Sequence, residues 1–330
     1  MARLLVRLPN WLGDALLART MLHAVRRASP RLEVLAVGPG PLLGLLAADG
    51  LFDAVEAWPA GGAARAALAR AVRAWGPDAA LVLPPSFSSA WFARRCGARR
   101  RAGFAHEGRS LLLTHPLRRR ARGDVHLARE YAALAACLGL GPADPPPPPP
   151  LAVPAPGAAE AEALLARVAP GDGPLALIGP GALYGPAKRW APERFAAVGR
   201  ALAGRGMRVV VCGAAAERET CRAVAEAADC PTLAGETSLA AQAALCARAA
   251  LAVCNDSGLA HLAAAAGAPT VAVFGSTSSA WTAPLGARVR VVQRPPVCAP
   301  CFRRTCAIGT RCLERVAVAD VLRACAEAAA

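Results

Sequence analysis

The chain of 330 residues is 55% hydrophobic, which provides enough apolar surface for two cores in domains of about 150 residues each. It contains no uncharged apolar run of about 18 residues, and Arg7, Pro9 and Asn10 interrupt the apolar N-terminal stretch, so the composition predicts neither a membrane-spanning helix nor a signal peptide. We therefore expect a cytosolic protein, whose formal net charge of +15 suits nucleic acid, an anionic membrane or a phosphorylated substrate.

The first half of the chain alternates short apolar strands with helices. This alternation predicts a parallel sheet that is covered by helices on both faces. Strands are expected at residues 4–8, 31–37, 52–58, 79–84 and 100–105. A turn at residues 9–14 leads into a helix that runs to about residue 27, and further helices are expected at residues 41–48, 63–75, 88–96 and 126–139.

Asp14 lies in the turn after the first strand, at the carboxyl end where ligand sites form in α/β sheets. A carboxylate there can accept a proton from a substrate hydroxyl, and Gly13 allows a close approach of the backbone. An acidic residue near a helix N-terminus can equally serve the helix dipole alone. Position leaves these two interpretations of Asp14 evenly matched.

Basic residues are concentrated in the first half, where residues 1–150 carry a net charge of +10 against +5 for residues 151–330. Solvated surface would explain any one arginine cluster, but three clusters within about 30 residues favour an anionic partner. The clusters are Arg94 with Arg95, Arg99 with Arg100 and Arg101, and Arg118 with Arg119, Arg120 and Arg122.

Six consecutive prolines at residues 145–150 mark a domain boundary, because such a run continues neither a helix nor a strand and acts as a semi-rigid spacer. We expect a first domain at residues 1–144, a linker at 145–157 and a second domain at 158–330. The second domain repeats the α/β alternation and ends in a helix that could pack back on the first. Strands are expected at residues 175–179, 207–213, 250–254, 270–274 and 287–293, and helices at 192–203, 217–228, 238–249, 259–266 and 318–328. Two such domains predict a cleft between the facing carboxyl ends of their sheets.

Residues 250–281 form the unit around which the second domain is organised: a strand, a polar turn, a helix of small residues and a second strand. The turn residues 255–258 precede a helix N-terminus, which suits a phosphate or a ribose. Asp256 or Ser257 could instead simply cap the helix. His261, one turn into the helix, and a second glycine-serine turn at 275–279 favour a ligand site.

Lys188 is the single lysine among 38 basic residues, and it ends a glycine-containing turn at residues 179–190. Arginine does not replace lysine where a compact ammonium must contact a phosphate, so the presence of Lys188 favours a functional role. Chance or a surface ion pair would also explain why this position is lysine. The glycines, Gly181 among them, free the backbone to approach a phosphate, but the spacing is not that of a Walker loop. Glu217, after the next strand, could bind ribose hydroxyls or begin a helix.

Twelve cysteines in a cytosolic chain of this size do not predict disulfides. Eight lie in apolar segments and should behave as small hydrophobic residues. The other four could form a tetrahedral zinc site, although a packed or redox-sensitive thiol loop is the alternative. These four are Cys298, Cys301, Cys306 and Cys312.

Four stretches together resemble the lipopolysaccharide heptosyltransferases of glycosyltransferase family 9, and most closely the branch that acts on the first heptose of the inner core. They are LVRLPNWLGDALLA, GPGALYGPAKRWAPERF, CNDSGLAHLAAAAGAPTVAVFGSTSSAWTAPLG and CAPCFRRTCAIGTRCL, in matching order over nearly the whole chain. The resemblance implies a GT-B fold of two Rossmann-like, doubly wound domains, with the donor nucleotide on the C-terminal one.

The implied reaction is an inverting transfer of L-glycero-D-manno-heptose from ADP-heptose to the first heptose of the lipopolysaccharide inner core. The resemblance makes Asp14 the catalytic base and Lys188 the cation that neutralises the diphosphate, with Glu217 on the adenosine ribose. It implies no required metal, and a place for the enzyme on the cytoplasmic face of the anionic inner membrane. Donor-site residues would be Gly181, Lys188, Glu217, Asp256, Ser257, Gly258 and His261, and acceptor- or membrane-side residues Asn10, Gly13, Arg94, Arg95, Arg99, Arg100 and Arg101.

Two alternatives stay open. One is another family 9 transferase with a different sugar or acceptor, which the donor turn cannot exclude. The other is a basic nucleic-acid-binding protein, but the aromatic content of 5% and the lack of a stacking motif argue against it.

Overall fold

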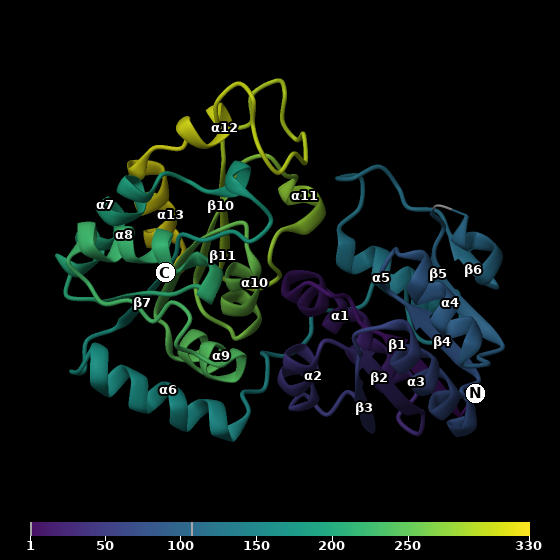
Figure 1. The fold of residues 1–330 in the computed structure, drawn as a ribbon. Helices are drawn as coiled ribbons and strands as arrows, with labels where there is room; N and C mark the ends of the chain where they lie inside the picture. The colour runs from purple at the N-terminus through teal and green to yellow at the C-terminus, as the bar shows by residue number, and fades with distance from the viewer. Residues whose placement is uncertain (1, 107) are drawn as a thin grey trace. The chain divides into compact units, whose positions relative to one another are not determined.

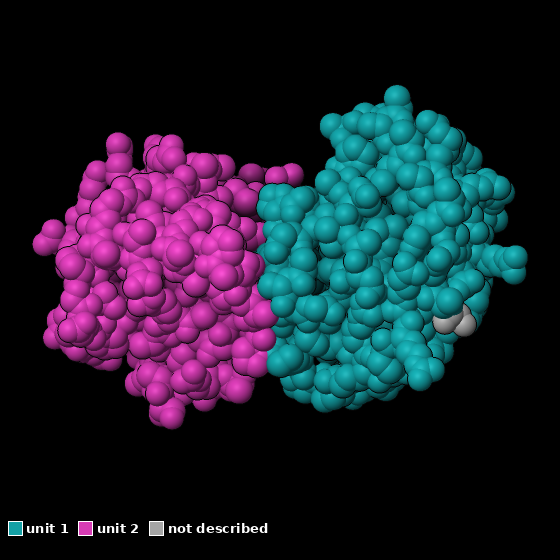
Figure 2. Space-filling view, turned by 90° about the horizontal axis from the view of Figure 1, so that it is seen from below, with its two compact units in different colours: residues 1–149 teal, residues 150–330 magenta. Residues whose placement is uncertain are grey.

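The computed structural model describes residues 2–106 and 108–330 (Figure 1). They divide into two compact units, unit 1 at residues 1–149 and unit 2 at 150–330 (Figure 2, teal and magenta). The division falls inside the proline-rich segment at residues 145–157. Each unit has its own parallel sheet and its own core.

Unit 1 contains a six-stranded parallel sheet in the order β3-β2-β1-β4-β5-β6. The two strands beside β1 are β2 and β4, which do not follow each other in the chain. The strand order therefore reverses at β1, as in doubly wound nucleotide-binding folds. The strands are β1 (Arg3–Arg7), β2 (Glu33–Gly38), β3 (Ala54–Ala57), β4 (Ala79–Val82), β5 (Arg100–Phe104) and β6 (His115–Leu117). Five of them match the predicted strands, whereas β6 has only three residues and gives no periodic signal.

Helices cover both faces of this sheet. On one face, α3 and α4 pack over alternate strand residues such as Leu5, Val37 and Val82. Phe92 of α4 belongs to the same hydrophobic core. Right-handed crossovers put α1 and α5, which pack against each other, on the opposite face. The helices are α1 (Leu12–Ala28), α2 (Gly40–Ala47), α3 (Gly62–Trp75), α4 (Phe87–Arg95), the 3-10 helix η1 (Arg109–Leu112) and α5 (Leu127–Ala136).

Unit 2 contains a five-stranded parallel sheet in the order β11-β10-β9-β7-β8. Its central strands are buried on both faces, which explains their unbroken apolar sequences. The strands are β7 (Leu175–Gly179), β8 (Arg208–Val211), β9 (Leu251–Asn255), β10 (Thr270–Phe274) and β11 (Val289–Gln293). All five occur where the sequence predicts them.

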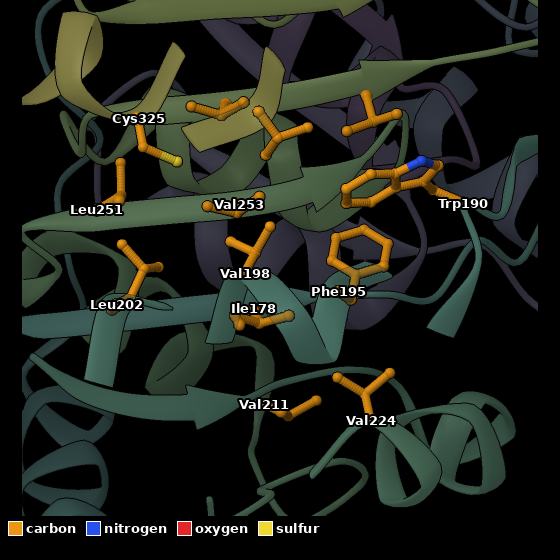
Figure 3. Close-up of a cluster of buried hydrophobic side chains, with 14 of the residues drawn as sticks. Ile178, Trp190, Phe195, Val198, Leu202, Val211, Val224, Leu251, Val253 and Cys325 are labelled. Atoms are coloured by element: carbon orange, nitrogen blue, oxygen red, sulfur yellow. The ribbon is translucent and has the colours of Figure 1, made fainter. Parts of the chain in front are cut away.

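A hydrophobic core of unit 2 lies between the sheet and the helices α7, α8 and α13 (Figure 3). Trp190 is buried there, edge-on to Phe195, and its indole N–H donates to the Val316 carbonyl at 3.1 Å. The other face carries α6, α9 and α10 (Figure 1). The helices are α6 (Ala155–Val168), η2 (Pro186–Lys188), α7 (Pro192–Ala203), η3 (Ala215–Glu217), α8 (Arg218–Ala228), α9 (Leu239–Arg248), α10 (Gly258–Ala265), α11 (Ser279–Thr282), α12 (Arg311–Glu314) and α13 (Val318–Ala329).

One feature of unit 2 differs from the sequence-based expectation. The predicted linker ends too late, because α6 begins at Ala155: Pro156 is tolerated in a first helical turn, and a Cβ on Gly157 would come within 2.5 Å of the Ala240 backbone of α9. The last helix, α13, packs on β10, β11 and α7 of its own unit, and its packing on unit 1 stays a prediction.

Across residues 2–106 and 108–330, every helix falls short of the length and hydropathy needed to cross a membrane.

Candidate functional site

Three polar turns meet at the carboxyl edge of the second sheet. They are residues 179–190 after β7, 255–258 after β9 and 275–279 after β10. Because β7, β9 and β10 are neighbouring parallel strands, their carboxyl ends emerge side by side. The predicted donor-site residues of these turns therefore lie together.

Lys188 and Asp256 form a nearly buried ion pair at this edge, with 2.6 Å between Lys188 Nζ and Asp256 Oδ2. The Thr277 hydroxyl donates to the same carboxylate oxygen at 2.5 Å. The ammonium also lies 4.9 Å from the centre of the Tyr184 ring. The Lys188 ammonium is thus fixed in position by groups from all three turns, and it remains 13% exposed.

Asn255 holds the turn that carries Lys188. Its side chain is fully buried, donates to the Pro180 carbonyl at 2.7 Å and accepts from the Trp190 amide at 3.0 Å. These two contacts connect Pro180 and Trp190, near the two ends of the turn, to the end of β9. Sequence reasoning did not select Asn255, although its position before Asp256 is part of the same polar turn.

The N-terminus of α10 lacks a side-chain cap from any described residue. Its N-cap is Ser257, and within the described residues no side chain caps the helix. The expectation that Asp256 or Ser257 might simply cap this helix is therefore wrong. Gly258 is the first helical residue, and His261 is buried one turn later, so the uncapped end suits an anion such as a diphosphate.

Gly181 and Glu217 contact each other. A Cβ on Gly181 would lie 2.2 Å from Cδ of Glu217, so only glycine fits beside this carboxylate. Glu217 Oε2 accepts from the Ala214 amide at 2.8 Å, which makes it part of the start of η3. Its Oε1 lies beside Gly181 at the rim of the Lys188 turn. Glu217 can therefore both stabilise the start of the helix and lie at the edge where a ligand would bind.

The cysteine-rich loop, residues 295–310, packs on the Lys188 turn. The Arg304 guanidinium donates to the Tyr184 carbonyl at 2.8 Å, and the Tyr184 hydroxyl donates to the Phe302 carbonyl at 2.5 Å. The Ala187 amide donates to the Arg304 carbonyl at 3.1 Å. The loop thus fixes the turn from the outside, a role that sequence reasoning missed.

The four cysteines considered as a possible zinc site differ in exposure. Cys298, Cys301 and Cys306 are exposed, while Cys312 packs at the edge of the core. The Cys306 thiol donates to the Gly309 carbonyl at 2.7 Å. In the described part of the chain, no group of three or more His, Cys, Asp or Glu side chains is placed to hold a metal ion.

In unit 1, Asp14 lies in the first turn of α1, at the carboxyl edge of the sheet. It is close to Tyr131 of α5: burial first, and then the Asp14 charge, raise the pKa of that phenol well above its usual value. Arg119 lies nearby, with its guanidinium 4.3 Å from the Phe104 ring centre and 3.7 Å from Glu130. The charges of Asp14, Arg119 and Glu130 therefore all act on the Tyr131 hydroxyl.

Asn10 is positioned by Arg7. The guanidinium donates to Asn10 Oδ1 at 2.8 Å and lies 4.1 Å from the centre of the Trp58 ring. Burial, and then the Arg65 charge, lower the pKa of Arg7 to about 10, so it remains charged at neutral pH. Together with Gly13, which precedes Asp14 in α1, these residues form the edge predicted for the acceptor.

Five arginines predicted for the acceptor or membrane side do not lie at the Asp14 edge of the sheet. α4 runs antiparallel to the strands, so its last turn is at the amino edge of the sheet, where β5 also begins. Hydrogen bonds from the Ala2 and Arg3 amides, at the start of β1, are the main cause of the lowered pKa of Asp78. The charge of Arg99 adds to this effect, so Arg99 lies near the amino end of β1. The structure thus separates from Asp14 the group Arg94, Arg95, Arg99, Arg100 and Arg101. Only the cluster at residues 118–122, which follows β6, lies at the same edge as Asp14.

A family model for glycosyltransferase family 9 (heptosyltransferase) matches residues 65–311. The chain belongs to glycosyltransferase family 9. It is 30% identical over 305 residues, 88% of each chain, to lipopolysaccharide heptosyltransferase 2 of Salmonella typhimurium. It is 30% identical over 301 residues, 86% of each chain, to lipooligosaccharide heptosyltransferase 2 of Haemophilus influenzae.

Solved structures agree with this family. The E. coli ADP-heptose LPS heptosyltransferase II superposes with a TM-score of 0.84 at 27% identity, over 99% of this chain and 98% of that one. A family 9 glycosyltransferase from Veillonella parvula superposes with a TM-score of 0.89 at 22% identity, over 99% and 97% of the two chains, and supports the fold. The predicted α/β class, two doubly wound sheets as in GT-B heptosyltransferases, is confirmed. The match favours a transferase over the nucleic-acid-binding alternative.

Proposed function

We propose that this family 9 glycosyltransferase transfers L-glycero-D-manno-heptose from ADP-heptose to the first heptose of the lipopolysaccharide inner core. The observation that carries the proposal is the 30% identity over 88% of the chain to a lipopolysaccharide heptosyltransferase 2. The four motifs that suggested the family lie in the turns described above, including the edge of unit 2 where Lys188 and Asp256 pair.

The chemistry of that edge suits a nucleoside diphosphate. The uncapped N-terminus of α10 offers backbone donors, and Lys188 offers an ammonium that Asp256 and Thr277 hold in place. Both favour the negative charge that grows on ADP as it leaves. Glu217 at the rim of the turn would accept from ribose hydroxyls.

In the proposed step, the acceptor hydroxyl oxygen forms a bond to the anomeric carbon of the heptose while the bond from that carbon to the ADP oxygen breaks. Asp14 takes the hydroxyl proton, and ADP leaves with the bonding electron pair. Attack from the face opposite to ADP inverts the anomeric configuration. Because Lys188 and the α10 N-terminus supply positive charge, we expect chelation of divalent metal by EDTA to leave the rate unchanged.

The partner on the acceptor side would be a phosphorylated glycolipid of the cytoplasmic face of the inner membrane. A net charge of +10 on residues 1–150 supports this, since it attracts anionic lipid and phosphate. Arg119 and the other arginines of residues 118–122 lie at the Asp14 edge, where such phosphates would bind.

The test is incubation of purified protein with ADP-heptose and inner-core lipid, followed by mass spectrometry. One acceptor carries the first heptose and a matched acceptor lacks it. We expect one added heptosyl residue on the first acceptor alone. Addition only to the acceptor that lacks heptose, or only from another sugar nucleotide, would instead indicate a family 9 transferase of different specificity.

A further inference from the structure

The exposed face of α4 combines aromatic and basic side chains. Phe87 is 51% exposed and Trp91 46% exposed, and the spacing of four residues puts them on one side of the helix. Arg94 and Arg95 continue that side into the last turn, and both are exposed. Neither arginine takes part in an ion pair between described residues.

The opposite side of α4 anchors the helix. Ala90, Phe92 and Ala93 are buried in the core of unit 1, where Phe92 packs edge-on against Trp58 at 5.0 Å between ring centres. Ser86 caps the helix by accepting from the Ser89 amide. The exposed aromatic side chains are therefore held on a rigid helix rather than on a mobile loop.

Leu111 of η1 extends the apolar part of this face. It is 87% exposed, and η1 packs against α4. The neighbouring Arg109 is fully buried and donates to the Ser86 carbonyl at 3.2 Å and to the Pro84 carbonyl, which joins η1 to the start of α4. Burial of such a guanidinium fixes the position of Leu111 beside the helix.

We propose that this face, Phe87, Trp91 and Leu111 with Arg94 and Arg95, docks unit 1 onto an anionic phospholipid bilayer. Aromatic rings are favoured at the level of lipid headgroups, and arginines beside them pair with anionic lipids. Three apolar side chains are too few for a stable protein interface. The inference rests on the proposed function, because that function requires a membrane-anchored acceptor.

The position of the face fits such an acceptor. α4 starts at the carboxyl edge of the sheet, directly after β4, and runs toward the amino edge. A bilayer on this face would therefore border the edge that carries Asp14 and Arg119. Of the two roles expected for Arg94 and Arg95, acceptor contact or membrane contact, the proposal assigns them membrane contact.

The test is co-sedimentation of the full chain with vesicles of phosphatidylcholine alone or mixed equally with phosphatidylglycerol. We expect binding to the mixed vesicles only. Replacing Phe87, Trp91 and Leu111 by serine should weaken it about tenfold, and replacing Arg94 and Arg95 by serine roughly 30-fold. As a matched control, serine at Arg27 and Arg31, which are exposed at the end of α1, removes the same charge and should change binding little. Equal losses in the control and α4 variants would overturn the proposal.

Two further measurements separate the alternatives. Brominated lipids should quench Trp91 fluorescence, and Trp91→Phe should remove that quenching. The triple serine variant should transfer heptose normally to a lipid-free core oligosaccharide but poorly to vesicle-bound acceptor.

Normal transfer to both acceptors would overturn the docking face and leave the proposed function intact. Vesicle binding by a wild-type protein that uses neither acceptor would overturn the function alone. A dimer that the triple variant abolishes, without vesicle binding, would show a protein interface instead.

Discussion

Lys188 shows at the scale of one residue how composition can indicate a site. It is the only lysine beside 37 arginines, and the structure places its ammonium between Asp256 and the Tyr184 ring. A planar guanidinium is larger and presents its donors in a fixed fork, so it does not reproduce this contact. Tyr184, under the ammonium, and Thr277, which donates to Asp256, both lie in the stretches that resemble the family, but sequence reasoning gave neither residue a role.

Substitution of Lys188 should therefore act on the reaction more than on the fold. We expect Lys188→Ala to lower kcat/KM at least about 100-fold, because a charge on the leaving diphosphate loses its partner. Lys188→Arg should recover only part of that loss. The control is Arg222→Ala, which removes an exposed cation paired with Glu226 in the same unit. Full activity of Lys188→Arg would mean that charge alone matters here.

Gly181 is required by its neighbour. Because an added Cβ would lie 2.2 Å from Glu217 Cδ, Gly181→Ala should displace that carboxylate and break its bond to the Ala214 amide. We expect KM for ADP-heptose to rise about tenfold, with Tm lowered, in steady-state kinetics and thermal melts. The double substitution Gly181→Ala with Glu217→Ala should regain Tm. Gly44→Ala is the matched control, since open space surrounds Gly44 in α2 and alanine favours a helix. An unchanged KM in Gly181→Ala would remove Glu217 from the donor site.

At the scale of elements, the periodic and strongly apolar segments were the predictable ones. The bounds of β7, α7 and β10 agree with the sequence to the residue, because buried strands and a helix with proline in its first turn have clear ends. α6 was missed because Pro156 and Gly157 read as helix breakers, although one suits a first turn and the other allows contact with α9. Short elements such as β6 carry too few residues for a pattern.

The packing of the cysteine-rich loop on the Lys188 turn could not be predicted, because the contacts join residues about 120 positions apart. It makes a prediction of its own. Arg304→Ala removes the bond to the Tyr184 carbonyl and should increase hydrogen exchange at residues 183–188, with about tenfold weaker ADP-heptose binding. Arg303→Ala is the control, because Arg303 is equally exposed and adjacent. Equal exchange in the two variants would contradict a fixing role for the loop.

At the scale of the whole molecule, the twelve cysteines divide by burial. Burial raises the pKa of Cys96, Cys212 and Cys325 to about 12, so at pH 8 almost none of these thiols is ionised. We expect a thiol reagent at pH 8 to modify the exposed Cys298, Cys301 and Cys306 quickly, and the buried thiols only after denaturation. Peptide mass mapping reads the sites. Fast labelling of Cys212 in native protein would contradict this core.

In the proposed reaction, unit 2 contributes Lys188 and Asp256, and unit 1 contributes Asp14. Motifs indicated the candidate residues of each unit, since these residues lie just after strands or in the first turn of the helix that follows. The sequence did not predict which arginines lie at the same edge of the sheet as Asp14. The position of an arginine cluster along the chain does not show whether the cluster lies at the carboxyl or the amino edge of the sheet. Arg119 lies at the Asp14 edge, whereas Arg94 does not.

The most direct test of this account is Asp14→Asn, measured for both ADP-heptose affinity by calorimetry and heptosyl transfer by mass spectrometry. A base that acts only in the chemical step should lower kcat at least about 100-fold when removed, while the Kd for ADP-heptose changes less than about twofold. A parallel loss of affinity and turnover, or transfer at the wild-type rate, would contradict the assignment of the base to unit 1 and of the donor to unit 2.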